Sequence, residues 1–126
     1  MPPPITHYVT AALLLLSPLT AAAWSTTDAK PVAELELMDD GELAHEALTA
    51  CLNVALNLPG SIQASNYLLT VYHVLRKKHG GAAPSWMGEM LHASTSGDSD
   101  QCGKAFDSYL TTQKQKYKSK VKKLTP

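Results

Sequence analysis

The fold is decided by the stretch "DDGELAHEALTACLNVALN", residues 39–57, which has the repeat of an amphipathic helix with a cysteine near its centre. Asp39 and Glu42 have the spacing of a capping box, in which each side chain accepts a hydrogen bond from the backbone of the other residue. Apolar side chains then recur at intervals of three or four residues: Leu43, Ala47, Cys51, Val54 and Leu58. The sequence therefore predicts a helix with one apolar face, which ends before Pro59 and Gly60.

Three further segments have a helical repeat. The second predicted helix covers residues 62–78, with Ser61 as its cap; a shorter third one begins at Ser85, and the last begins near Gln101. Apolar stripes run along the second and last of them: Ala64, Tyr67, Leu68, Val71, Tyr72 and Leu75, then Phe106, Leu110, Tyr117, Val121 and Leu124. No segment alternates with period two over a useful length. These patterns predict an all-α fold, a small bundle of about four helices over residues 39–126.

Residues 1–23 have the pattern of a cleaved signal peptide. Residues 9–16 form an apolar core of suitable length, Pro18 follows it, and residues 21–23 are three alanines of the kind that a signal peptidase requires. We therefore expect cleavage before Trp24 and export of the chain to the periplasm or the exterior. An uncleaved membrane anchor is the alternative, although the apolar run is shorter than the roughly 20 residues of a spanning helix.

The chain from Trp24 onward is long enough for one small domain with a modest core. Its first part, residues 24–38, is predicted to form a loose N-terminal arm before the helical domain, because the segment "STTDAKPVAE", residues 25–34, is polar and contains a proline. We find no internal repeat, so the predicted organisation is a signal peptide, an arm and one domain.

If the chain is exported, its two cysteines, Cys51 and Cys102, are expected to have a structural role. In an oxidising compartment two thiols of one small domain are expected to form a disulfide bond, whereas in the cytosol they would be small buried side chains. The bond would close a loop of about 52 residues, which the loop-entropy model values at roughly 4 kcal/mol. A redox role is not expected, because the pair lacks the C-x-x-C spacing that lowers a thiol pKa.

The charges are sorted along the chain although the net charge is zero. From Trp24 to Leu75 there are seven acids and one base, and from Arg76 to the end there are ten bases and four acids. One interpretation is that the acidic first helix packs beside the basic last helix. The other concerns "KQKYKSKVKK", residues 114–123, which could cover a phosphate backbone or an anionic lipid surface. We expect a solvated helix end here and no nucleic-acid binding, since the run has no arginine and one aromatic residue.

Side chains suited to catalysis or metal binding are few. His45 is followed by Glu46 but lacks the second histidine of the zinc-protease motif, His73 and His79 are poorly spaced for one helix face, and His92 stands alone. No nucleophile elbow, glycine-rich phosphate loop or apolar carboxylate pair occurs in the sequence. We therefore expect no enzyme activity, no metal site and no cofactor.

Three segments together, "ALTACLNVAL" (47–56), "IQASNYLL" (62–69) and "QCGKAFDSYL" (101–110), resemble the bacterial type VI secretion amidase immunity proteins. The resemblance extends over residues 40–124 and lies in the helical architecture and the placement of the cysteines. It implies a periplasmic protein, often dimeric, that blocks a cell-wall amidase by covering its active site. The sequence differs from the family in the spacing after Cys102 and in its lysine-rich end.

The expected function is thus that of an exported binding protein which inhibits a protein partner, with a homodimer as one assembly. The alternative is a secreted or envelope-associated interaction protein or effector that uses its basic last helix. In the first case we expect the contact at residues 94–100, "STSGDSD", a polar loop that joins the third helix to the last and is free to project. Ser96, Asp98 and Asp100 would make the contact, with Trp86 and Met87 as an apolar anchor. The alternative is that Asp98 or Ser99 only caps the last helix and that Trp86 and Met87 belong to the core.

Overall fold

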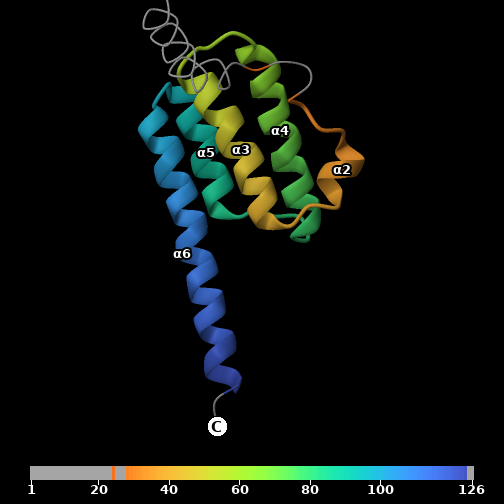
Figure 1. Ribbon diagram of the computed structural model, residues 1–126, viewed down its shortest axis with the longest axis vertical. Helices are drawn as coiled ribbons and strands as arrows, with labels where there is room; N and C mark the ends of the chain where they lie inside the picture. The colour runs from red at the N-terminus through yellow and green to blue at the C-terminus, as the bar shows by residue number, and fades with distance from the viewer. Residues whose placement is uncertain (1–23, 25–27, 125–126) are drawn as a thin grey trace, which may run out of the picture.

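The computed structural model describes residue 24 and residues 28–124, and the predicted signal peptide lies outside these residues. The part of the chain that it describes contains five helices and no strand, which confirms the all-α prediction. The helices are α2 (Val32–Glu36), α3 (Asp40–Ala55), α4 (Ser61–Lys78), α5 (Ser85–Ser96) and α6 (Ser99–Leu124). The four long helices form a bundle, and the short helix α2 lies against one side of this bundle (Figure 1).

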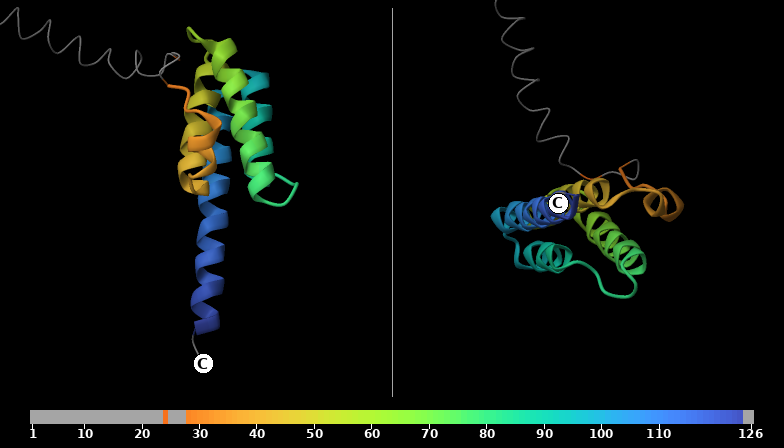
Figure 2. Two further views of the ribbon diagram at one scale, coloured as in Figure 1. Left: turned by 90° about the vertical axis from the view of Figure 1, so that its right-hand side faces the viewer. Right: turned by 90° about the horizontal axis from the view of Figure 1, so that it is seen from below.

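Helix α3 is the central element because it packs against α4, α5 and α6. Its start has the predicted capping box: the Glu42 amide donates to Asp39 Oδ1 at 2.8 Å, and the Asp39 amide donates to Glu42 Oε1 at 3.4 Å. The face that it buries is made mostly of small side chains, which let the neighbouring helices approach closely: Leu43, Ala44, Ala47, Ala50 and Cys51. Seen from below, the four long helices surround a shared core (Figure 2).

The N-terminal arm is not loose along its whole length. Pro31 caps α2, and Leu35 within this short helix is fully buried against α4. Trp24 is also buried, its amide donates to the Pro59 carbonyl at 3.0 Å, and its ring lies 4.9 Å from that of Tyr67. The buried side chains of Trp24 and Leu35 therefore hold the arm to the bundle, and the prediction of a loose arm is wrong for these residues.

The sorted charges meet mainly between the acidic segment and α4. Helix α3 does pack beside the first half of α6, as predicted, but the acidic side chains of α2 and α3 pair elsewhere. Glu36 pairs with Lys77 at 3.5 Å and Glu46 pairs with Lys30 at 2.9 Å, and Asp40 is hydrogen-bonded to the His79 ring at 2.8 Å. Side chains at the end of α4 and in the arm are therefore the partners of these acids, a role expected of the last helix.

Candidate binding surface

The corner between α5 and α6 is a tight turn and not a long loop. Residues 94–96, predicted as part of a loop, form the last turn of α5, which ends at Gly97 in the left-handed conformation with φ 71°. The Asp98 amide donates to the Ala93 carbonyl at 3.1 Å, and Asp98 Oδ1 accepts from the amides of Asp100 and Gln101 at 3.1 and 3.3 Å. Asp98 therefore caps α6, and the predicted projecting loop does not exist.

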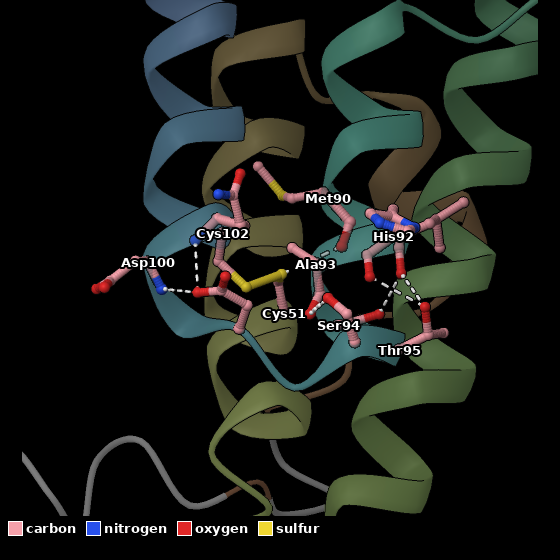
Figure 3. The surroundings of a disulfide bond; sticks show 12 residues. Cys51, Met90, His92, Ala93, Ser94, Thr95, Asp100 and Cys102 are labelled. Carbon is pink, nitrogen blue, oxygen red and sulfur yellow. Dashed lines mark hydrogen bonds between the residues drawn. A yellow bond between two sulfur atoms is a disulfide. The ribbon is translucent and has the colours of Figure 1, made fainter.

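The disulfide bond fixes this corner from inside the bundle. Cys51 in the middle of α3 and Cys102 in the first turn of α6 form it, with their Cα atoms 6.0 Å apart and both side chains fully buried (Figure 3). The predicted pairing is confirmed. On the outer side of the corner, the carboxylate of Asp100 points away from the bundle (Figure 3). The exposed polar groups of the turn therefore lie on a part of the backbone that the disulfide bond holds in place.

The predicted apolar anchor belongs to the core. Trp86 is 2% exposed and Met87 is 0% exposed, so neither offers a surface to a partner. The Trp86 ring meets the edge of Tyr109 on α6 at a centroid distance of 5.3 Å and an interplanar angle of 71°. Of the five predicted contact residues, the structure leaves Ser96, Asp98 and Asp100 exposed at the corner and buries the two apolar ones in the core.

A groove runs between α5 and α6 on the outer face of the bundle. It consists of two adjoining hollows of about 440 and 390 Å³, which share Glu89, Lys104 and Ser108. Gly88 opens it on the α5 side, since a Cβ atom added there would meet nothing within 4 Å. The remaining lining residues are His92, Gln101 and Ala105 in one hollow, and Ser85, Asp107, Thr111 and Thr112 in the other. The groove therefore offers donors, acceptors and charges of both signs to a polar segment.

The sequence contains a signal for this groove that the sequence analysis missed. On α5, the groove residues 85, 88, 89 and 92 recur at intervals of three or four. On α6, the groove residues 101, 104, 105, 108, 111 and 112 recur at the same intervals. These positions are small or polar in both helices, so two facing polar stripes could have been recognised. Their contact across the helix pair, however, depends on the tight corner at Gly97.

A partly buried polar network ties the arm to α3 and α4. The Tyr67 hydroxyl donates to Glu46 Oε1 at 2.7 Å, and Glu46 Oε2 accepts from Lys30 at 2.9 Å. Burial raises the pKa of the Tyr67 phenol, and its hydrogen bond to the Glu46 carboxylate raises it further. Burial also raises the pKa of Tyr109, with a smaller effect from Asp39 and Asp40.

The pKa values of Tyr67 and Tyr109 are higher in the folded state than the usual value of about 10. As the pH rises, the unfolded state therefore releases its phenolic protons at a lower pH than the folded state does. We expect stability to be unaffected by these groups below about pH 10 and to fall above it. Tyr67→Phe should reduce this alkaline loss, whereas Tyr117→Phe, on an exposed side chain, should not. Melting curves between neutral and strongly alkaline pH measure the difference, and an equal alkaline loss in the Tyr67→Phe protein would contradict this assignment.

The four histidines of the described residues lie apart from one another. His45 is on the surface against Phe106 with a ring distance of 4.9 Å, His79 pairs with Asp40, His92 lines the groove, and His73 borders a hollow between α2 and α4. Among residue 24 and residues 28–124, no three histidine, cysteine, aspartate or glutamate side chains are grouped so that they could hold a metal ion.

No family model, curated protein or solved structure matches the chain. Within the described residues, no helix has both the length and the apolar content needed to cross a membrane.

Proposed function

We propose that the chain is an exported binding protein that inhibits a protein partner through the groove between α5 and α6. The disulfide bond supports export, because such bonds persist in oxidising compartments and are rare in the cytosol. The particular partner that we propose is a cell-wall amidase, which would make the chain an immunity protein of the periplasm.

The observation that carries the proposal is that the groove is built on a rigid base. At one end of the groove lies the corner between α5 and α6, which the Cys51–Cys102 bond holds and Asp98 caps. Between the two helices, the Trp86 ring packs against the Tyr109 ring. A surface that is ordered before binding loses less conformational entropy in the complex, and this favours tight inhibition. The mixed charges of Glu89, Lys104 and Asp107 suit an enzyme surface loop better than a small apolar ligand.

Two helical glycines provide a matched test. Gly88 opens the groove, whereas Gly103 lies on α6 outside it, and an added Cβ at either position meets nothing within 4 Å. After pull-down of an amidase from periplasmic or cell-wall proteins, the wild type, Gly88→Trp and Gly103→Trp should be titrated against it. We expect Gly88→Trp to weaken the affinity at least ten-fold, about 1.4 kcal/mol, and Gly103→Trp to leave it nearly unchanged.

Melting curves should be recorded for all three proteins, so that a loss of fold is distinguished from a blocked groove. Equal affinities of the two variants, with both folded, would exclude the groove as the contact surface. Capture of no amidase, or binding that does not inhibit the enzyme, would exclude the immunity function.

A further inference from the structure

Helix α6 is longer than the bundle that it belongs to. Its first half packs against α3 and α5, whereas its second half continues beyond the lower end of the bundle, where no other helix of the described residues lies beside it (Figures 1 and 2). We call residues 113–124 the projecting segment. At 1.5 Å per residue it extends about 18 Å. The end predicted to be a solvated helix end is a continuous helix as far as Leu124.

The projecting segment continues an exposed apolar stripe. Its spacings of seven, four and three residues place the side chains on one helix face. Their exposed fractions are 44% for Leu110, 70% for Tyr117, 43% for Val121 and 84% for Leu124. Exposed leucine and tyrosine side chains are common singly, but a stripe aligned over four turns of one helix resembles a contact surface.

Lysines border this stripe on both sides. At 100° per residue, Lys114 and Lys118 lie on one flank of Tyr117, and Lys116 and Lys120 lie on the other. The segment has six lysines and no acidic residue. A basic helix with a narrow apolar face is the pattern of helices that lie in the interface of a membrane, where lysines extend to the headgroups while the apolar face is buried.

Three acidic side chains of the first half have partners outside the projecting segment: Glu36 and Glu46 pair with Lys77 and Lys30, and Asp40 is hydrogen-bonded to His79. Side-by-side pairing of two projecting segments would bring lysines together, which is unfavourable. Lysine repulsion at i, i+4 within the helix, as between Lys114 and Lys118, is also relieved best by an extended anionic surface.

We propose that the projecting segment binds an anionic lipid surface, with Tyr117, Val121 and Leu124 in the interface and the lysines on the headgroups. Charge complementarity selects this partner, because each lysine near such a surface contributes attraction. The stripe favours lipid over nucleic acid, which has no apolar face to receive it. On α6, Leu110 and the groove residue Ser108 are about 200° apart, so the groove stays open on the side away from the lipid.

The test uses the full mature chain and vesicles of phosphatidylcholine with or without phosphatidylglycerol. Three variants are compared with the wild type in a flotation assay at low salt. The stripe variant, Tyr117→Ser/Val121→Ser/Leu124→Ser, keeps every lysine, and the charge variant, Lys114→Gln/Lys118→Gln/Lys120→Gln, keeps the stripe. The control, Leu56→Ser/Ile62→Ser, removes apolar side chains that are 50% and 74% exposed elsewhere.

We expect wild type and control to bind phosphatidylglycerol vesicles alike, and the stripe and charge variants to bind at least about ten-fold more weakly. High salt should weaken wild-type binding, because screening reduces the attraction. Circular dichroism checks that each variant keeps the bundle. Undiminished binding by the folded stripe variant, no preference for phosphatidylglycerol, or tighter binding to duplex DNA than to vesicles would each overturn the proposal.

Discussion

Replacing both cysteines by alanine, Cys51→Ala/Cys102→Ala, should lower the free energy of unfolding by about 4 kcal/mol. The bond joins residues 51 positions apart, so its removal restores the freedom of a large loop in the unfolded chain. A domain of this size has a total stability of about 5–15 kcal/mol, so the loss is a large fraction of it. At about 4–8 °C per kcal/mol, the melting temperature should fall by about 15–30 °C.

Thermal melts of the oxidised wild type, the reduced wild type and the variant measure this effect. The reduced wild type should melt near the variant, and reductant should not change the variant further. In the mature wild type without reductant, a thiol assay should detect no free cysteine, in agreement with the structure. Two reactive thiols in that protein, or a fall in stability below about 1 kcal/mol, would contradict the structural role of the bond.

The helices could be predicted because their signals are local. The Asp39 and Glu42 capping box, the apolar repeat and the glycines after α4 lie within a few residues of the boundaries that they determine. The disulfide pairing also followed, since two cysteines allow one intramolecular bond. What is predicted well is therefore the set of elements and the one cross-link between them.

The arm and the corner could not be predicted from local patterns. Leu35 is one of several apolar residues in its segment, and its neighbours Val32 and Leu37 are exposed, so only the contact with α4 makes Leu35 the core residue. Residues 94–96 have the serine and threonine composition of a loop, yet the hydroxyls of Ser94 and Ser96 donate to the Leu91 and Ala93 carbonyls within α5. The composition of residues 94–96 permits both a loop and a helix end, and the packing of α5 on α3 decides which of the two forms.

The candidate site shows the same limit. Trp86 and Met87 are as suitable for a core as for an interface, because large apolar side chains dominate both. The sequence places Gly88 and Ser108 in two separate helices, and their meeting in one groove depends on the pairing of α5 with α6. The lysine-rich run was recognised, but the length of α6 beyond the bundle, which exposes its stripe, is a property of the three-dimensional structure.

Trp86→Ala should lower the free energy of unfolding by about 3–5 kcal/mol, because it leaves a cavity between α5 and α6. Trp86 is 2% exposed and makes an edge-to-face contact with Tyr109, so both its apolar area and its aromatic contact are lost. Trp86→Phe keeps an aromatic ring and should be clearly less destabilising. Glu89→Ala, an exposed change on the same helix, should stay within about 0.5 kcal/mol of the wild type.

Urea unfolding of these four proteins gives the free energies, and titration with the partner under conditions where each is folded gives the affinities. If Trp86 is a core residue, the affinity of the folded Trp86→Phe protein should equal that of the wild type, since no ring atom needs to reach the partner. An interface anchor would behave in the opposite way, with weakened binding and unchanged unfolding. If Trp86→Ala lowers the free energy of unfolding by less than about 1 kcal/mol, the change is too small for the loss of a buried tryptophan side chain. Trp86 would then be a residue of the contact surface.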